Sequence, residues 1–230
     1  MALLEVIALT AEDARAAEEG GADRLEVVAD MAADGLTPDP EVVVEMRRAT
    51  TLPMRVMLRA NAGFRTTAPE LDRLRRAAEG LAEAGADGFV LGFLDPFGVV
   101  DAGSVGKLAN ALPGELPWTF HRALDHSADP VAGWAAVRRL GCDTVLTAGS
   151  PRGVESGLDV LVRRAAEGPS SARLLMAGGG LRRKHVAVLA AAGVGAFHVG
   201  TAVRPEGSWE APVDASLVAE WRSLVTAASA

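Results

Sequence analysis

The sequence predicts an α/β protein of the (β/α)₈ class, a TIM-like barrel formed as a single domain over residues 1–230. Short apolar segments alternate with amphipathic segments eight times along the chain. Such alternation predicts a parallel sheet with right-handed crossovers. Eight strand–helix units in 230 residues fit a closed barrel, which typically takes about 250 residues.

The expected elements follow one another in a regular order. The apolar segments predict strands at 3–9, 24–29, 54–60, 88–94, 117–123, 143–149, 173–179 and 196–202. The amphipathic segments predict helices at 10–20, 39–49, 68–84, 102–111, 130–140, 154–167, 182–192 and 214–228.

Glycines mark the boundaries between these elements. The phrases "EEGGADRLEV", "EAGADGFVLG", "RLGCDTVLT" and "AAGVGAFHVG" repeat one order of helix end, glycine, small residue and strand. The alternative is an open doubly wound sheet, which usually has a G-x-G-x-x-G turn after its first strand. The corresponding "ALTAEDA" contains no glycine, so the closed barrel is favoured.

Composition limits the possible partners and location. The net charge of −7 argues against a nucleic-acid surface, and no apolar run reaches the roughly 20 residues that span a bilayer. The first residues lack the basic start of a signal peptide, so we expect a cytoplasmic protein. The expected partner is a small molecule or a metal. Cys142 is the single cysteine, which excludes an intramolecular disulfide, and we expect it to be a small buried hydrophobe.

Ionisable side chains share one parity along the expected strands. Alternate strand residues face the barrel interior, and catalytic groups of such barrels lie at the carboxyl ends of the strands. The opposite parity is apolar and suits contact with the helices. We therefore expect five polar side chains to converge in the barrel mouth, either as a ligand site or as a buried network of mutually satisfied pairs: Glu5, Glu26, Arg59, His121 and His198.

Residues 118–125, "WTFHRALD", place three polar residues around the end of one strand. We expect His121 to face the site, Arg122 to be a partner or loop anchor, and Asp125 to lie on the rim. The candidate catalytic residues are Glu26, His121 and Asp125, with Glu5, Arg59, Arg122, Thr147 and His198 as substrate-binding candidates.

Two loops rich in small residues predict an anion site. "LLMAGGGL" ends the seventh expected strand and "HVGTAVR" ends the eighth, which is where such barrels commonly bind phosphate. The alternative is a tight turn that simply needs glycine. The binding candidates in these loops are Gly178, Gly179, Gly180, Gly200 and Thr201.

Other chemistry receives less support. His121 and His198, with Glu5 or Glu26, could form a nitrogen and oxygen metal site. Met57 and Met176 favour a core role, and His126 and His185 are expected to be exposed. Neither Lys107 nor Lys184 lies at a strand end, which disfavours Schiff-base chemistry.

In order along the chain, "GGADRLEV", "GLTP", "TFHRALD", "VLTAGS", "MAGGGL" and "FHV" resemble the CutC copper-homeostasis family from Leu4 to about Arg204. The resemblance implies a TIM-like barrel, a cytoplasmic location, a homodimer and a role in copper binding or tolerance. An acidic surface with the exposed-looking Trp134, Trp209 and Trp221 is in keeping with self-association, and the alternative is that each tryptophan packs on the barrel. Positions that match the family's pattern are Glu26, Arg59, His121, Arg122, Asp125, Thr147, Gly178, Gly180 and His198.

The chain also departs from that pattern. Val28 stands where the family commonly has a cysteine, and "RANAGF" keeps Arg59 but lacks a second arginine and an aspartate. A serine that often follows the histidine of the eighth strand is replaced around Gly200. These losses weaken the expectation of thiolate copper binding.

Two functions therefore remain as expectations. The first is copper homeostasis by resemblance to the family. The alternative is an enzyme that acts on a small anionic, possibly phosphorylated substrate by acid–base chemistry, as isomerases and lyases do. A ligand sensor without chemistry is a third, weaker possibility.

Overall fold

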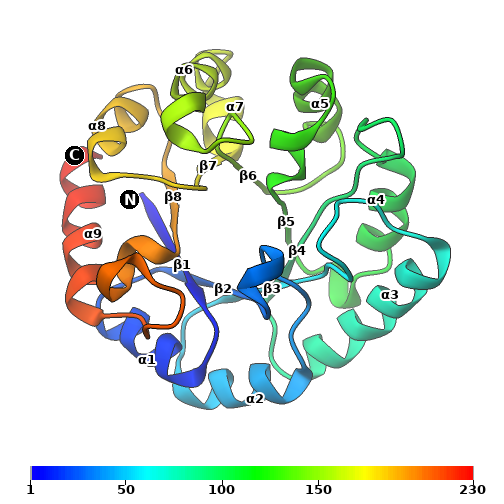
Figure 1. The fold of residues 1–230 in the computed structure, drawn as a ribbon, viewed down its shortest axis with the longest axis horizontal. Coiled ribbons are helices and arrows are strands. Elements are labelled where there is room, and N and C mark those ends of the chain that lie inside the picture. The colour runs from blue at the N-terminus through cyan, green and yellow to red at the C-terminus, as the bar shows by residue number, and fades with distance from the viewer. Residues whose placement is uncertain (1, 230) are drawn as a thin grey trace.

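A closed barrel of eight parallel strands forms the centre of the molecule. The computed structural model describes residues 2–229. The strands follow one another around the barrel in chain order, and β8 pairs with β1 to close it (Figure 1). Their bounds are β1 Leu3–Ala8, β2 Arg24–Val27, β3 Met54–Met57, β4 Gly88–Leu91, β5 Trp118–Phe120, β6 Thr144–Thr147, β7 Leu175–Ala177 and β8 Ala196–Val199. The predicted fold class is confirmed.

Helices surround the barrel on its outside (Figure 1). They are α1 Ala11–Glu19, α2 Pro40–Ala49, α3 Ala68–Glu83, α4 Ala102–Ala109, α5 Pro130–Val137, α6 Val154–Ala165, α7 Pro169–Leu174, α8 Arg183–Ala191 and α9 Ala215–Ala228. Short 3₁₀ turns occupy the connections at η1 Met31–Ala33, η2 Pro113–Glu115, η3 Arg122–His126, η4 Thr201–Val203 and η5 Pro205–Gly207. In residues 2–229 no helix combines the length and hydrophobicity that crossing a membrane requires.

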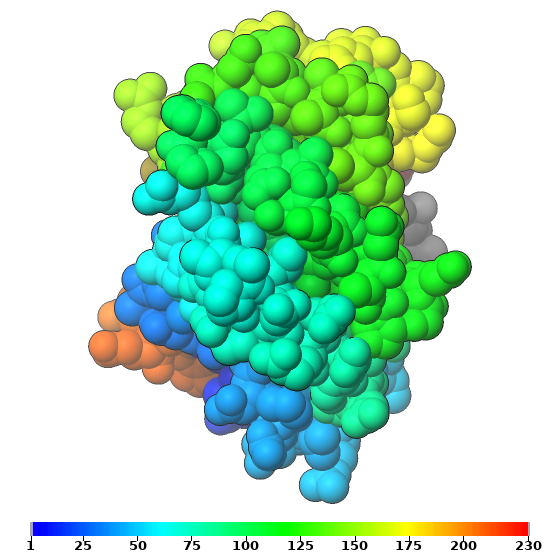
Figure 2. Space-filling view, turned by 90° about the vertical axis from the view of Figure 1, so that its right-hand side faces the viewer, coloured from blue at the N-terminus to red at the C-terminus, as the bar shows by residue number. Residues whose placement is uncertain are grey.

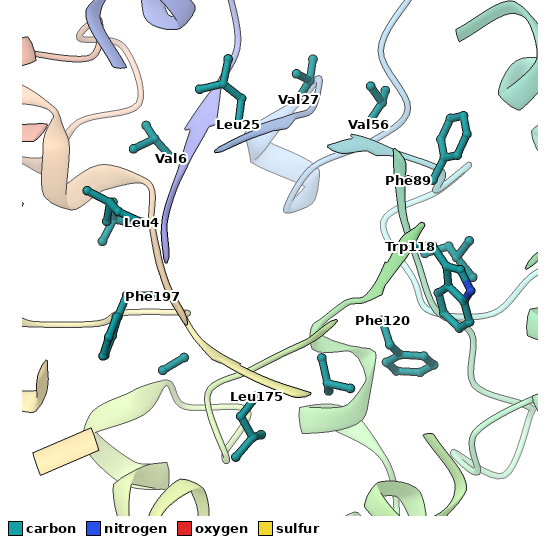
Figure 3. Close-up of a cluster of buried hydrophobic side chains, with 14 of the residues drawn as sticks. Leu4, Val6, Leu25, Val27, Val56, Phe89, Trp118, Phe120, Leu175 and Phe197 are labelled. Carbon is teal, nitrogen blue, oxygen red and sulfur yellow. The ribbon is translucent and has the colours of Figure 1, made fainter. Parts of the chain in front are cut away.

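The main hydrophobic core lies between the strands and the helices. Figure 3 shows strand side chains pointing away from the barrel centre, and those it labels are Leu4, Val6, Leu25, Val27, Val56, Phe89, Trp118, Phe120, Leu175 and Phe197. All of them are buried. The predicted parity is confirmed: these apolar residues face the helices, so the alternate residues are left to face the barrel interior.

Polar side chains fix where several helices begin. Thr67 and Glu70 form a reciprocal capping box at the start of α3, and the carboxylates of Asp101, Asp129 and Asp214 accept backbone N–H groups at the starts of α4, α5 and α9. The observed helices begin and end within three residues of the bounds expected from the sequence. Helix α7 is the exception, because no helix was expected there.

Two segments differ from the prediction. The fifth strand ends at Phe120, and the residues after it turn into η3, with His121 as its N-cap. The strand expected from residue 173 begins at Leu175, because Pro169 follows Gly168 and starts the short helix α7. Arg122 thus lies in a turn, where strand parity does not determine its direction.

Burial corrects several further predictions. Trp134 and Trp221 are buried, and Trp209 is half-buried, so the tryptophans do not form an exposed set. Figure 2 shows from outside the flank formed by α3, α4 and α5. Trp134 of α5 packs toward α6 instead: Arg164 Cζ lies 5.2 Å from its ring centroid, and its Nε1 donates to Glu167. His185 was expected to be exposed but is buried, with Nδ1 accepting from the Arg182 amide. His126 is exposed, as predicted, and Cys142 is half-buried against the core.

Candidate functional site

A cavity of about 250 Å³ lies at the carboxyl ends of the strands. Its wall contains residues that end or directly follow β2, β3, β5, β7 and β8. The polar and glycine positions in the wall are Glu26, Asp34, Arg59, His121, Arg122, His126, Gly179, Gly180, His198, Gly200 and Thr201. Apolar side chains such as Met57, Phe64 and Trp209 complete it. This is the end of the barrel where the sequence predicts a site.

A row of charged side chains crosses the interior beneath the cavity. Strand register places Glu5 of β1 beside Arg24 of β2 and His198 of β8. Arg24 Nε donates to Glu5 Oε2 at 2.5 Å, and His198 Nδ1 lies 2.8 Å from Glu5 Oε1. Burial alone would raise the pKa of Glu5, but Arg24 and His198 outweigh it and lower that pKa to about 2. Glu5 is therefore an anion held between two positively charged partners.

His198 links this row to Glu26. His198 Nε2 lies 3.7 Å from Glu26 Oε2. Burial opposes the charged imidazolium, but Glu26 and Glu5 together outweigh burial and raise the pKa of His198. His198 thus lies between two carboxyl groups that favour its charged form, and one of them lies in the cavity wall.

The Glu26 carboxyl group makes no hydrogen bond within residues 2–229, since Oε2 lies 3.7 Å from His198 Nε2, beyond hydrogen-bond distance. Its Oε1 is buried and has no hydrogen-bond partner within residues 2–229. Burial, helped by the negative charge of Glu5, raises the pKa of Glu26 to about 7 against the opposing effect of His198. Both the carboxyl and the carboxylate are therefore accessible near neutral pH, which is the property of a general acid or base.

His121 is a neutral hydrogen-bond donor. The Ala123 amide donates to its Nδ1 at 3.2 Å, so in the neutral ring the proton is on Nε2. Nε2 is buried without a partner among the described residues. Burial, together with Arg59 and Arg122, lowers the pKa of His121 to about 3. Gly92 provides the space for this ring, since a Cβ there would lie 2.8 Å from His121 Nδ1.

Two loops bring backbone amides to the opposite part of the cavity wall. Residues 179–181 follow β7 and residues 200–202 follow β8, and all six line the cavity. Among the described residues, none of these six N–H groups donates a hydrogen bond to a backbone or side-chain acceptor. Gly179 and Gly180 have φ values of +88° and +72°, a conformation that glycine adopts without strain. Adjacent free amides of this kind form a concave site for an anion.

Arg122 places a positive charge against the first of these loops. A Cβ on Gly179 would lie 2.5 Å from Arg122 Nε, so the guanidinium packs directly on that glycine. Nε donates to Asp125 at 2.9 Å, while its side chain stays 31% exposed. Arg122 is therefore oriented by Asp125 and still reaches the cavity.

Asp125 does not fill the predicted place on the rim. Its side chain is fully buried away from the cavity, and its oxygens accept from Arg122 Nε, the Thr147 hydroxyl and the amides of Ala148 and Gly149. Both oxygens are thus used within the protein. The predicted catalytic position of Asp125 is corrected to an internal anchor for Arg122, and Thr147 is part of the same anchor.

Arg59 lines the cavity but holds loops together. Its guanidinium donates to the carbonyls of residues 33–35 after β2 and of residues 62 and 63 after β3. It also lies over the Phe64 ring, 4.7 Å from the centroid. Since these carbonyls take most of its N–H groups, Arg122 is the better placed cation for a bound anion.

The structure brings most of the predicted residues together. Nine of them line the cavity: Glu26, Arg59, His121, Arg122, Gly179, Gly180, His198, Gly200 and Thr201. Glu5 lies beneath it, and Gly178 leaves space for His198, because a Cβ there would lie 2.8 Å from the His198 Cβ. Glu5, Asp125, Thr147 and Gly178 therefore support the wall from behind.

The sequence reasoning missed two features of the site. Arg24 has the same inward parity as Glu26, two residues earlier, and that parity could have identified it. Trp209 reaches the cavity from the excursion after β8, and a Cβ on Gly200 would lie 2.4 Å from its ring. No periodic pattern in the sequence indicates that contact.

Only some of the predicted metal ligands lie close together. Glu5, Glu26 and His198 offer ligand atoms within 4.8 Å of one another, but His121 is not among them. A neutral His121 that accepts at Nδ1 has an N–H at Nε2, so it has no lone pair there for a metal. In the three-residue cluster Arg24 and the His198 proton already neutralise the carboxylates.

Fold and site together define a (β/α)₈ barrel with a ligand cavity at the carboxyl ends of its strands. The model of the CutC family matches residues 2–203, so the chain belongs to the CutC family. A family protein CutC of Klebsiella pneumoniae strain 342 is 37% identical over 199 residues, which cover 86% of this chain and 79% of the relative. One from Xanthomonas campestris pv. campestris strain 8004 is 39% identical over 201 residues, covering 85% and 81%.

A solved structure has the same fold. The crystal structure of a protein from Streptococcus agalactiae, named for copper homeostasis and CutC, superposes with a TM-score of 0.77 at 24% identity. The match covers 87% of this chain and 98% of that protein. At this identity the match shows a shared fold.

Proposed function

We propose that this protein acts in copper homeostasis, the role stated in the name of its Streptococcus agalactiae relative, and that its barrel mouth binds a small anionic molecule at acid–base groups. The family resemblance extends the proposal to a cytoplasmic homodimer. The two parts of the proposal are separable, because a protein can affect copper tolerance without storing the ion.

The donor atoms of the cavity do not suit the binding of copper(I). Copper(I) prefers thiolate and thioether sulfur. Cys142 lies before β6, at the barrel end opposite the cavity, and burial and Asp143 raise the pKa of its thiol to about 12. The Met176 sulfur accepts from Arg24 inside the barrel. The cluster of Glu5, Glu26 and His198 offers nitrogen and oxygen, which suit a divalent ion better.

One observation supports an anion site with acid–base groups. Two buried polar atoms of the cavity residues, Glu26 Oε1 and His121 Nε2, have no partner within residues 2–229. Unsatisfied buried polar atoms cost about 1–3 kcal/mol each, and a ligand that bonds them offsets this cost. The free amides of the two loops and Arg122 add the complementary positive end.

Isothermal titration tests both parts. Copper(I) and inorganic phosphate are titrated separately into the wild-type protein and into the Arg122→Gln and Arg139→Gln variants, and copper(I) is also titrated into Glu26→Ala. Arg139 is exposed, lies outside the cavity and provides a matched loss of charge.

We expect phosphate to bind the wild type and Arg139→Gln equally and Arg122→Gln at least tenfold more weakly. Copper(I) should give only weak binding that neither substitution changes. Tight stoichiometric copper(I) binding, lost in Glu26→Ala, would show instead that the barrel mouth is a copper site. Phosphate binding that is equal in all three proteins would contradict the anion site.

A further inference from the structure

We infer that the molecule bound in the barrel mouth is a small phosphorylated ketone or aldehyde, and that Glu26 and His121 enolise it. This inference rests on the proposed anion site. It adds the class of ligand and the reaction, both of which follow from the unpartnered hydrogen-bonding groups of residues that line one cavity.

His121 determines the first functional group of the ligand. The Ala123 amide fixes the tautomer, so the ring offers only an N–H donor to the cavity. Burial, together with the nearby Arg59 and Arg122, lowers the pKa of this ring and so disfavours a second proton. A neutral N–H donor in a buried site pairs with an oxygen acceptor, and a carbonyl oxygen that gains negative charge during a reaction is the acceptor it stabilises most.

Glu26 supplies the group that moves a proton. Its Oε2 lies 3.7 Å from His198 Nε2, beyond hydrogen-bond distance, and its Oε1 has no partner among the described residues, so the carboxyl group is free to bond a ligand. The row of Arg24, Glu5 and His198 holds the carboxyl in place from below. A carboxylate positioned in this way removes a proton from carbon only if an adjacent carbonyl is polarised at the same time, and His121 is the donor available for that.

The two loops determine the other end of the ligand. The two loops offer six amides without acceptors, with Arg122 against Gly179, which is more donors than a planar carboxylate can use. A tetrahedral phosphate monoester offers three terminal oxygens for such a site. The cavity of about 250 Å³ lies just below the size range of drug-sized pockets, which favours a ligand no larger than a simple sugar phosphate.

The chemical step is balanced within the ligand and Glu26. The Glu26 carboxylate takes a proton from the carbon next to the carbonyl. The C–H electron pair becomes the new C=C bond, and the carbonyl π pair moves to oxygen, which accepts the hydrogen bond of His121. The Glu26 carboxyl then returns a proton to carbon. In D₂O the Glu26 carboxyl group returns a deuteron to carbon, so C–H exchange can be measured even when no net product forms.

The test follows ligand C–H signals by proton NMR in D₂O. The probes are dihydroxyacetone phosphate, ribulose 5-phosphate and fructose 6-phosphate, with unphosphorylated dihydroxyacetone for comparison. The proteins are wild type, Glu26→Gln, His121→Phe and Glu79→Gln, all purified in parallel to detect contaminating isomerases. Glu79 is exposed on α3, outside the cavity, and controls for the loss of a carboxylate.

We expect the wild type and Glu79→Gln to exchange one C–H of at least one phosphorylated probe at least a hundredfold faster than buffer. Glu26→Gln and His121→Phe should each reduce that rate at least a hundredfold, and dihydroxyacetone should exchange far more slowly. Thermal shifts with the same probes establish binding and folding of each variant. Binding without exchange, or exchange that persists in Glu26→Gln, would overturn this inference and leave the anion site standing. The absence of any phosphate-dependent binding would remove both.

Discussion

At the scale of single residues, Glu26 shows a strong conflict between burial and charge. Its side chain is almost entirely buried, beside the anion Glu5 and the cation His198. A core selected for stability alone would replace such a group by an apolar one. The free Oε1 and the raised pKa of Glu26 are explained if a ligand uses this carboxyl.

The Glu26→Gln substitution should change how stability depends on pH. The pKa of Glu26 is about 7 in the folded protein and near 4.5 when unfolded. The folded state therefore holds this proton more tightly, so its contribution is fully present below pH 4.5 and is lost as the pH rises through 7. The loss amounts to about 3 kcal/mol, from about 1.4 kcal/mol per pKa unit.

Urea denaturation between pH 4.5 and pH 8 measures this effect. Relative to wild type, Glu26→Gln should gain free energy of unfolding steadily as the pH rises. Glu79→Gln, at an exposed position, provides the control. Parallel curves for wild type and Glu26→Gln would show that the Glu26 proton is not held in the folded state.

His121 should remain neutral at mildly acidic pH. Burial and two neighbouring arginines lower its pKa to about 3, and the Ala123 amide fixes the proton on Nε2. Because the unfolded chain binds this proton near pH 6.5, stability from His121 falls as the pH drops below that value. Long-range ¹H–¹⁵N NMR at pH 5 should show a neutral ring protonated at Nε2. An imidazolium, or a proton on Nδ1, would contradict the assigned donor role.

The sequence could identify these residues but only part of their roles. Inward parity correctly indicated Glu5, Glu26, His121 and His198, because parity depends on the strand repeat alone. Arg59 was expected to hold an anion, and instead it holds loop carbonyls. Its partners are backbone atoms of a 3₁₀ turn and an irregular loop, whose positions no side-chain pattern encodes.

At the scale of elements, the loop after β7 is the part most sensitive to a single methyl group. Gly179 and Gly180 both have positive φ, so alanine costs about 1–2 kcal/mol at each. A Cβ on Gly179 would also collide with the Arg122 guanidinium, while nothing lies within 4 Å of one on Gly180. Asp125 holds Nε of that guanidinium, which limits how far it can shift.

Gly179→Ala should therefore weaken phosphate binding at least tenfold, whereas Gly180→Ala should keep it within about threefold. The two variants form a matched pair, since both introduce the same backbone strain. Titration with inorganic phosphate, after circular dichroism has shown folding, measures the difference. Equal affinities would mean that Arg122 and its contact with Gly179 do not contribute to the anion site.

Most elements could be predicted because their signals are local. A polar side chain caps the start of α1, α3, α4, α5 and α9, and a glycine follows the end of α1, α3, α5 and α8. Helix α7 was missed because it covers only Pro169–Leu174 and merges into an apolar strand. The end of β5 was misplaced for a similar reason, since His121 leaves the strand to cap η3.

At the scale of the whole molecule, the C-terminal helix α9 contacts the loop after β8 that lines the cavity. Trp221 of α9 is fully buried, and its Nε1 donates to the carbonyl of Ala202 in the loop that lines the cavity. Trp221→Ala should lower the free energy of unfolding by about 3–5 kcal/mol through cavity formation. Denaturation in urea measures it, with half-buried Trp209→Ala expected to lose less. A loss below about 1 kcal/mol for Trp221→Ala would contradict this packing.

The central claim is that the barrel mouth of this CutC-family protein binds an anion between the loops after β7 and β8. Its most direct test is an anomalous difference map from crystals soaked in tungstate, a heavy tetrahedral dianion. We predict the strongest peak within hydrogen-bond distance of the amides of residues 179–181 and 200–202 and beside Arg122. A map with no peak there, or with peaks only on exposed surface arginines, would contradict the claim.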